Sequence, residues 1–276
     1  MSADNGKQSD AGTEFRDWWQ TGIIDMEPGK INLRGYPVQS LIGELSFVQM
    51  IWLMVRGEVP DEKQAALLEA ALVAAVDHGP LAPSIATARM AMTCGIGINS
   101  AMASAINVLG DVHGGAGQGA LEIYLEILGH MDAGESLDAA VDRALAPRLA
   151  EKQIIPGFGH RFHPIDPRTP RLFELCDKAV ADGVIGGRFV AIGKAVEAWL
   201  EKAKGRHLPM NIDGVTAVIY GELGFEPDMA RGLFILSRSV GILAHAYEQK
   251  QQGGRIKGPV NPKLSYKYTG PGEREL

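Results

Sequence analysis

Titratable side chains recur in this sequence beside glycines and prolines, where a chain turns and where ligands are usually bound. His160 lies in Ile154–Arg168 (IIPGFGHRFHPIDPR), a stretch too rich in glycine and proline to continue a regular element. An imidazole next to the Arg161 guanidinium on such a turn suits the binding of a carboxylate substrate. A basic surface loop is the alternative interpretation.

Two more histidines stand in glycine-containing breaks. His78 lies in DHGP (Asp77–Pro80) at the end of an expected helix, where a histidine also suits the negative end of the helix dipole. His113 lies in DVHGGAGQGA (Asp111–Ala120), whose glycines allow a ligand to approach the backbone closely. The next helix would point its first amides at an anion, and a neutral His113 could polarise a carbonyl.

An aspartate and an arginine complete the set of reactive groups. Asp213 lies in NIDGVTA ahead of an expected helix, where an N-cap is the favoured interpretation and a general base of raised proton affinity the other. Arg238 lies among apolar residues in ILSRSVG. A partly buried cation needs an anionic partner, which is either a protein carboxylate or a ligand.

Two further motifs predict little. His160 and His163 form an H-x-x-H pair, but no third ligand stands at a usual spacing, so no metal site is expected. The spacing Gly115-x-Gly117-x-x-Ala120 resembles a dinucleotide fingerprint without the surrounding βαβ pattern. A dinucleotide-dependent oxidoreductase therefore stays an alternative of another class.

Composition sets the broad class of protein. The 276 residues have 46% hydrophobic and 22% charged side chains, which is ordinary for a soluble globular protein. A net charge of −6 argues against a nucleic-acid partner. Two cysteines without a CxxC motif fit a reducing compartment, and neither a signal peptide nor a membrane span is expected. We therefore expect a cytoplasmic protein.

The periodicity of apolar residues predicts helices. Helical spacing covers residues 61–76, 119–128, 189–203 and 228–250, whereas the alternation that marks strands is scarce. The fold class is therefore predicted to be all-α. Linker-like composition lies at residues 77–84, 110–119, 156–170 and 205–214, so the candidate functional groups gather at the breaks between helices.

Together, these groups suit one kind of chemistry. Two histidines, an aspartate and several arginines can make or break a carbon–carbon bond next to a thioester. The carboxyl group would move the α-proton, one histidine would stabilise the enol(ate), and the other would move the hydroxyl proton. Arginines would hold the substrate carboxylates.

The order of these motifs resembles that of the citrate synthase superfamily, from about Leu33 to the C-terminus. GDVHGGAGQ resembles its first catalytic-histidine segment, PGFGHR…DPR its second, NIDG its catalytic-aspartate segment, and SRSVGILAHAYEQ its arginine helix. VDHGP followed by TAR, NIDG itself and GLFILSRSVGILAHAYEQK look closer to stand-alone citryl-CoA lyases and to the citryl-CoA lyase module of ATP-citrate lyase.

The resemblance implies a role for each matching residue and a two-domain fold. His113, His160 and Asp213 would be catalytic, His78, Arg161, Arg168 and Arg238 would bind substrate, and Gly157 and Gly159 would contact coenzyme A. A large helical domain (31–116 and 224–276) would follow a partly disordered segment (1–30), and a small domain (117–223) would close over the cleft. A coenzyme A thioester would be substrate or product, with no permanently bound cofactor. The superfamily also implies a homodimer or higher homo-oligomer, and the absence of a ligase portion leaves room for a separate CoA-ligase partner.

Two departures from the synthases leave the substrate open. The span from His160 to Arg168 is one residue shorter, and Gly258 precedes Pro259 where the synthases have an arginine that reaches the neighbouring subunit. Lys257 or Arg255 would have to replace that arginine. The leading hypothesis is a lyase that cleaves citryl-CoA, or a citramalyl- or malyl-type thioester. A condensing synthase and a non-catalytic CoA-binding subunit of a larger complex are the alternatives.

Overall fold

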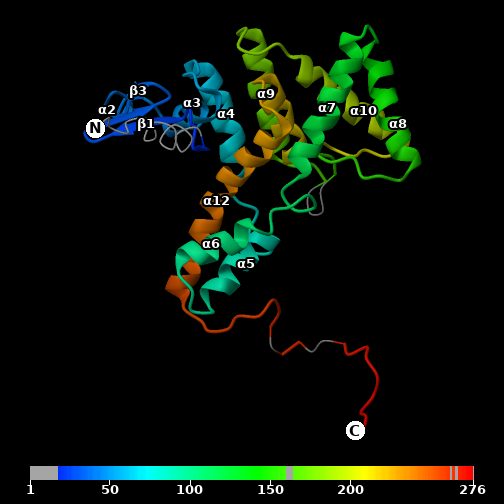
Figure 1. Cartoon of the computed structure of the whole chain (residues 1–276). Coiled ribbons are helices and arrows are strands. Elements are labelled where there is room, and N and C mark those ends of the chain that lie inside the picture. The colour runs from blue at the N-terminus through cyan, green and yellow to red at the C-terminus, as the bar shows by residue number, and fades with distance from the viewer. Residues whose placement is uncertain (1–17, 160–163, 262, 265–266, 276) are drawn as a thin grey trace, which may run out of the picture. The chain divides into compact units, whose positions relative to one another are not determined.

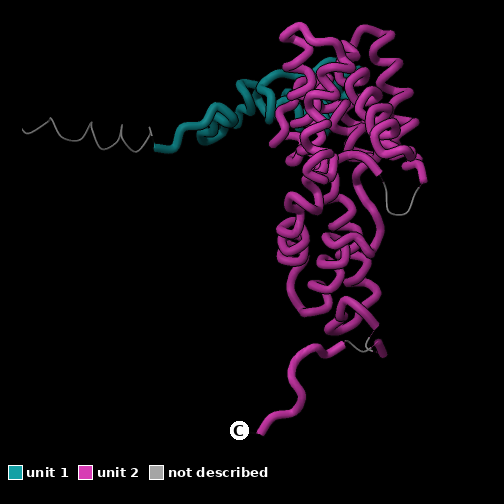
Figure 2. Tube along the Cα trace, turned by 90° about the vertical axis from the view of Figure 1, so that its right-hand side faces the viewer, with its two compact units in different colours: residues 1–66 teal, residues 67–276 magenta. Residues whose placement is uncertain are grey.

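The computed structural model describes residues 18–159, 164–261, 263–264 and 267–275. The chain divides into two compact units, unit 1 with residues 1–66 and unit 2 with residues 67–276 (Figure 2). This boundary differs from the predicted division into residues 31–116 with 224–276 and residues 117–223, which stays a prediction. Residues 1–17 of the segment expected to be partly disordered lie outside the described residues.

The described part of unit 1 contains a small antiparallel sheet in the order β1-β2-β3 (Figure 1). Its strands are β1 (Ile24–Glu27), β2 (Lys30–Leu33) and β3 (Tyr36–Pro37), and α2 (Val38–Leu41) and α3 (Phe47–Arg56) follow. The register pairs Glu27 with Lys30 and Leu33 with Tyr36, so each connection is a two-residue turn. Strands of two to four residues are too short to give a readable alternation, which is why the sequence did not predict this sheet.

Unit 2 is helical, which confirms the predicted fold class. After α4, which begins at the end of unit 1, its elements are α5 (Pro83–Met92), α6 (Ile98–Ile106), α7 (Ala116–Asp132), α8 (Leu137–Ala150), α9 (Arg168–Ala181), α10 (Arg188–Lys204), α11 (Ile212–Glu222) and α12 (Pro227–Gln252). The helices expected at 61–76, 189–203 and 228–250 are α4 (Glu62–Ala75), α10 and α12. The helix expected at 119–128 is the longer α7. No described helix is long and apolar enough to cross a membrane.

The most deeply buried helix of unit 2 is α11, which packs against α7, α9 and α10. Every residue from Gly214 to Gly221 is buried. Glycines let neighbours approach closely, since a Cβ on Gly221 would lie 2.4 Å from the Phe189 ring and one on Gly193 2.7 Å from Val218. The middle and the end of α11 are therefore tightly packed against their neighbours.

A second core lies where the C-terminal half of α12 meets α5 and α6. Its buried residues are Ala82, Ile85, Ala88, Ala105, Leu109, Ile242 and Ala246. The long helix α12 also packs on α7, so it joins both helical groups of unit 2 (Figure 1). Side chains midway along α12 therefore lie between the two groups.

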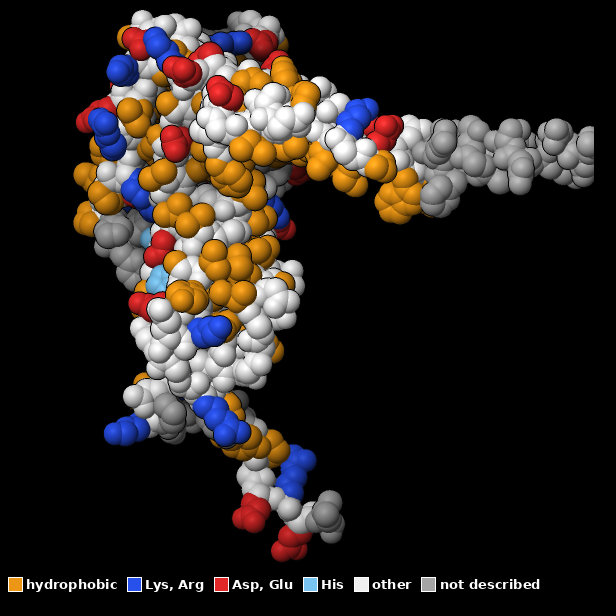
Figure 3. All heavy atoms as spheres, turned by 90° about the vertical axis from the view of Figure 1, so that its left-hand side faces the viewer, with side chains coloured by type: hydrophobic (Ala, Val, Ile, Leu, Met, Phe, Trp, Pro, Cys, Tyr) orange, Lys and Arg blue, Asp and Glu red, His pale blue; other side chains and the backbone are white. Residues whose placement is uncertain are grey.

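The outer side of α12 carries an exposed apolar stripe. Leu236, Val240, Leu243 and Tyr247 are spaced three and four residues apart, so they share one side of the helix, and all four are exposed. Hydrophobic side chains also reach the surface at several places on the face shown in Figure 3. Such a stripe is a common feature of surfaces that bind another protein.

Candidate active site

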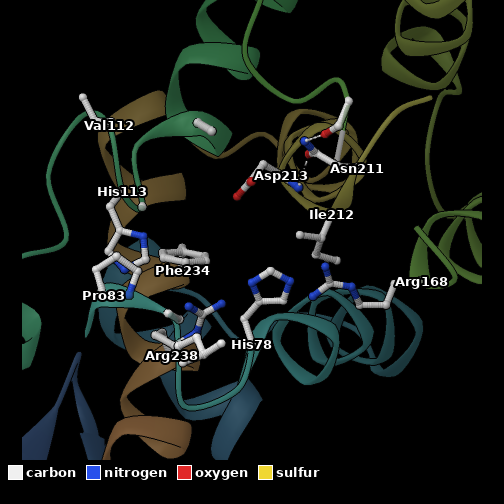
Figure 4. A pocket seen from close by; sticks show the side chains of 15 residues that line it. His78, Pro83, Val112, His113, Arg168, Asn211, Ile212, Asp213, Phe234 and Arg238 are labelled. Carbon is white, nitrogen blue, oxygen red and sulfur yellow. Dashed lines mark hydrogen bonds between the residues drawn. The ribbon is translucent and has the colours of Figure 1, made fainter. Parts of the chain in front are cut away.

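A cavity of about 360 Å³ in unit 2 brings together most of the candidate residues (Figure 4). Its walls come from the α4–α5 loop, the α6–α7 loop, and the chain that enters α9 and α11, with α12 completing them. The residues that line it are His78, Leu81, Ala82, Pro83, Val112, His113, Gly114, Ala116, Gly159, Arg168, Asn211, Ile212, Asp213, Phe234 and Arg238. Histidine, arginine and aspartate side chains from segments far apart in the sequence thus share one space.

Asp213 lies in the first turn of α11 rather than at its N-cap. Asn211 is the cap, and its side-chain oxygen accepts hydrogen bonds from the N–H groups of Asp213 at 2.9 Å and Gly214 at 3.3 Å. The N-cap interpretation of Asp213 is therefore wrong, because the aspartate carboxyl is left for the cavity that it lines. Asn211 also donates to the carbonyl oxygen of Gly159 at 2.8 Å, so the cap joins this turn to the segment Pro156–Gly159, here called the glycine loop.

Burial raises the pKa of the Asp213 carboxyl, although Arg238 and Arg168 oppose the shift. Asp166 adds to the rise through its own negative charge. A carboxyl group with a raised pKa can hold a proton and deliver it to carbon, which is the property that proton transfer requires. The site thus favours the general acid–base interpretation of Asp213.

His113 is held as a neutral ring by the start of α5. Its Nε2 accepts a hydrogen bond from the Ser84 N–H at 3.2 Å and lies 3.1 Å from the Ser84 hydroxyl. A backbone N–H can only donate, so Nε2 is the acceptor and the proton of the neutral ring sits on Nδ1. Burial and the charge of Arg238 lower the pKa of His113. A neutral Nδ1–H can donate to a developing enolate oxygen without carrying charge into the site.

Arg238 is a buried cation in the wall of the cavity. Its Nε donates to the carbonyl oxygen of Ala75 at 3.1 Å, and its guanidinium carbon lies 4.9 Å from the centre of the Phe234 ring. Burial lowers its pKa, whereas the charges of Asp213 and Asp77 raise it. The salt bridges found among the described residues do not include Arg238, so its terminal nitrogens can receive a substrate carboxylate.

The guanidinium group of Arg168 already has protein hydrogen-bond partners, which the sequence did not indicate. Its Nε and Nη2 donate to the two oxygens of Asp166 at 2.9 and 2.7 Å, and its Nη1 donates to the carbonyl oxygen of Ala74 at 3.1 Å. Burial alone would raise the pKa of Asp166, but this fork and the N–H groups of Arg168 and Ile212 hold it below its usual value. Arg168 therefore contributes a fixed positive charge to the cavity wall.

His78 completes the polar lining between Arg238 and Arg168 (Figure 4). It sits in a turn that Gly79 closes with a φ of +82°, a conformation that side chains rarely adopt. His160 and Arg161 lie outside the described residues, as does His163 of the H-x-x-H pair. No group of three potential metal ligands was found among the described residues.

The glycine loop before His160 is joined to the start of α11. Gly159 N–H donates to the carbonyl oxygen of Pro209 at 2.7 Å, and Asn211 N–H donates to that of Gly157 at 3.0 Å. A Cβ on Gly157 would lie 2.7 Å from the Cα atom of Gly214, so only glycine fits there. The loop and the Asp213 turn are therefore joined directly by backbone hydrogen bonds and close packing.

A second cavity of about 810 Å³ shares residues Val112, Ala116, Gly159 and Asn211 with the first. Residues 154–159 form one wall, so Gly157 and Gly159 both line it. Arg231 lies at this cavity and pairs with Asp111 at 2.6 Å. The two adjoining cavities provide space for a small polar group and for a longer attached group.

The glycine pattern at Gly115–Ala120 does not have the surroundings of a dinucleotide site. It opens α7 after a loop, and Gly115 is the N-cap of that helix. The named strands of the described chain all belong to the antiparallel sheet of unit 1. A dinucleotide fingerprint needs a preceding strand of a parallel sheet, so the structure does not support the oxidoreductase alternative.

Sequence reasoning missed several residues that hold the site together. Asp166, Asn211, Ser84 and Phe234 are not among the predicted functional residues, yet each contacts one of them. Two signals in the sequence could have found Asp166 and Asn211: the Asp-Pro-Arg motif at residues 166–168 and an asparagine directly before Ile212. Ser84 and Phe234 carry no local signal, because their roles depend on contacts across the fold.

The family described as "Citrate synthase, C-terminal domain" matches residues 60–259, which is most of the chain. The chain belongs to the citrate synthase family. The matched range contains every predicted catalytic and substrate-binding residue. The superfamily resemblance inferred from the ordered motifs is therefore confirmed.

Individual relatives include both lyases and synthases. The solved citryl-CoA lyase from Hydrogenobacter thermophilus is 33% identical with a TM-score of 0.82, and the match covers 94% of this chain and 97% of that one. An ATP citrate lyase from Methanothrix soehngenii, solved with citrate and coenzyme A, has a TM-score of 0.78 at 20% identity over 98% of this chain and 45% of that one, which shows the shared fold. Citrate synthase 2 of Bacillus subtilis is 30% identical over 80% of this chain and 55% of its own length. The chain thus spans about half the length of the curated synthases that it matches.

Proposed function

We propose that this protein is a carbon–carbon lyase that cleaves citryl-CoA, or a related 3-hydroxy-3-carboxyacyl-CoA, to acetyl-CoA and a 2-oxo acid such as oxaloacetate. The observation that carries the proposal is one cavity that gathers Asp213, a neutral His113, His78 and two arginines. The near full-length match to a citryl-CoA lyase favours cleavage over condensation.

The proposed cleavage moves one proton from oxygen to carbon. His160 takes the hydroxyl proton, and the electrons of that O–H bond form the new carbonyl of the 2-oxo acid. The carbon–carbon bond breaks, and its electron pair forms the enolate of acetyl-CoA, which accepts a hydrogen bond from the Nδ1–H of His113. Protonated Asp213 then delivers its proton to the methylene carbon. His160 releases the proton that it took from the hydroxyl group to solvent, and Asp213 takes up a proton from solvent, which restores both groups.

Charge in the cavity suits a substrate with several carboxylates. Arg238 offers a guanidinium fork, and Arg168 adds a fixed positive charge although Asp166 occupies its own fork. His78 lies between them and can donate to a carboxylate or carbonyl oxygen. Arg161 is proposed as a further substrate contact on the resemblance alone.

The second cavity is proposed to hold the coenzyme A part of the substrate. Gly157 and Gly159 present backbone there without side chains, which allows close approach of a planar group. The thioester enters and leaves as substrate or product and is not a resident cofactor.

Condensation is the second candidate function, because the curated relatives include citrate synthases. The same residues would act in reverse, with Asp213 taking the α-proton. A binding-only subunit, a separate CoA-ligase partner and a homo-oligomer also stay proposals. The exposed apolar stripe of α12 supports the last of these.

A panel of 3-hydroxyacyl-CoA thioesters tests the proposal. Cleavage of citryl-CoA should release oxaloacetate, measured as NADH oxidation with added malate dehydrogenase. Net thiol release from acetyl-CoA and oxaloacetate would instead assign a synthase. The Asp213→Ala variant should lose turnover while it still binds coenzyme A, which a binding-only subunit would not show. If no thioester in the panel is cleaved, the lyase proposal is refuted.

A further inference from the structure

The turn that carries His78 is contacted by a group of side chains that do not line the cavity. Asp77 Oδ2 accepts a hydrogen bond from the Gly79 N–H at 3.1 Å, so the carboxylate closes the turn around His78. Burial alone would raise the pKa of Asp77, but the bonds from Gly79 and His245 hold it below its usual value. At neutral pH this group is therefore a carboxylate that holds the Gly79 N–H, directly after His78.

His245 of α12 is the second support of this turn. Its Nε2 lies 3.3 Å from Asp77 Oδ2, and its Nδ1 lies 3.0 Å from Nη1 of Arg89 on α5. A guanidinium has donors and no acceptor, so Nδ1 must be the acceptor. The neutral ring then carries its proton on Nε2 and donates it to Asp77. The contact with Arg89 thus selects the tautomer that can hold the turn.

The groups around this histidine keep it in place. Arg89 also pairs with Glu248 and donates to Gln252 at 2.7 Å, and both of these residues lie on α12. The side chains of His245 and Arg89 are only 18% and 11% exposed, so water competes weakly with their contact. Glu248 also lies 3.9 Å from Nδ1 of His245. Arg89 is therefore anchored to the same helix as the histidine.

Gly241 brings α12 close to the turn. A Cβ at this position would lie 2.2 Å from the carbonyl oxygen of Val76 and 3.0 Å from Oδ1 of Asp77. The helix thus touches the backbone on which the turn begins. Arg238 lies one turn before Gly241 and His245 one turn after it, so a single helix carries both the Arg238 that lines the cavity and the His245 that contacts the turn of His78.

We propose that His245 is a positioning residue: held by Arg89, it fixes through Asp77 the turn that presents His78 to the carboxylate-bearing part of the substrate. The inference rests on the proposed function, since His78 is a substrate-binding residue only within it. It gives a role to Arg89 of the TAR motif and to His245 of the AHAYEQ segment, neither of which lines the cavity.

Two amide substitutions separate the contacts of the ring. In His245→Gln the side-chain amide can reach the place of Nε2 and donate to Asp77, whereas in His245→Asn it reaches only the place of Nδ1, near Arg89. His245→Asn should weaken oxaloacetate binding by roughly tenfold to a hundredfold, the range for losing a hydrogen bond to a charged group. His245→Gln should recover most of the affinity. Coenzyme A binding should stay within about twofold in both variants, because it depends on other residues.

Calorimetric titration with oxaloacetate and with coenzyme A measures these affinities, and thermal unfolding shows that each variant is folded. His207→Ala is the matched control, because that exposed histidine pairs with Glu197 and Glu201 and does not line the cavity. Nitrogen-15 NMR of the wild-type protein should show His245 as the Nε2–H tautomer, and Arg89→Met should release that preference. Neither NMR result depends on activity.

The outcomes are distinct. If folded His245→Asn binds oxaloacetate as tightly as the wild type does, or if the ring is an Nδ1–H tautomer, the positioning role is overturned and the proposed function is untouched. If the wild-type protein binds no oxaloacetate and cleaves no thioester of the panel, the proposed function fails and the inference fails with it.

Discussion

Replacing Gly157 with alanine should displace the first turn of α11 and lower both activity and stability. Gly157 has a φ of +86°, and a Cβ would lie 2.7 Å from the Cα of Gly214, the residue after Asp213. Ordinary contacts of a Cβ begin at 3.4 Å, so the two segments would have to separate by about 0.7 Å. Both are backbone, so no flexible side chain can absorb the change.

The expected magnitudes follow from that separation. A left-handed alanine costs on the order of 1 kcal/mol, and overpacking of a filled site costs about 1–3 kcal/mol more. The free energy of unfolding should therefore fall by roughly 2–4 kcal/mol. Because a misplacement near 1 Å can cost about a hundredfold in rate, kcat should fall by at least about tenfold.

Gly183→Ala is the matched control. Gly183 also has a positive φ, of +71°, but nothing lies within 4 Å of its would-be Cβ. In this variant the free energy of unfolding should fall only by the backbone strain of about 1 kcal/mol, and kcat should stay unchanged. Urea unfolding and the coupled cleavage assay measure both quantities. If folded Gly157→Ala keeps the kcat of Gly183→Ala, the coupling of the glycine loop to Asp213 is refuted.

The remaining predictions concern the groups in the cavity. Asp213→Asn should lower kcat by about 10²–10⁴-fold in the cleavage assay. Because folding raises the pKa of Asp213, its charge destabilises the fold increasingly as pH rises above the unfolded value, so urea unfolding should show the asparagine variant gaining stability over the wild type from acid to neutral pH. If the stability difference between Asp213→Asn and the wild type is the same at acid and at neutral pH, this prediction is contradicted. His113 should titrate by NMR below the usual histidine range, and a midpoint above it would exclude the neutral donor. Arg238→Lys should weaken oxaloacetate binding by roughly tenfold or more, since an ammonium does not reproduce the fork or the Nε–Ala75 contact, and unchanged affinity in a titration would remove Arg238 from the substrate site.

The helical fold could be predicted from the sequence because long amphipathic helices repeat their apolar positions several times. The segments predicted at residues 61–76, 189–203 and 228–250 correspond to α4, α10 and α12 with ends shifted by one or two residues. The sheet of unit 1 was missed because its short strands offer too few positions for a period. The helix α7 was predicted too short because its first turn is glycine-rich and its last turn polar.

The candidate site was predicted in its residue types and less well in its contacts. His78, His113, Asp213 and Arg238 do share one cavity, as the ordered motifs implied. Asp213 was favoured as an N-cap from its local sequence, and Asn211 turned out to hold that place. Both residues suit a cap, and only the structure shows that Asn211 has the extended backbone of a cap while Asp213 is already helical.

The sequence by itself determined the helical class, the order of the reactive groups and the family, because each of these depends on local spacing along the chain. Only the tertiary structure decided what state each group is in. Ser84 lies 29 residues from His113 and selects its tautomer, and Arg89 does the same for His245 across 156 residues. Such contacts leave no periodic trace, since they arise where helices cross. They are nevertheless what sets proton position and charge in this cavity.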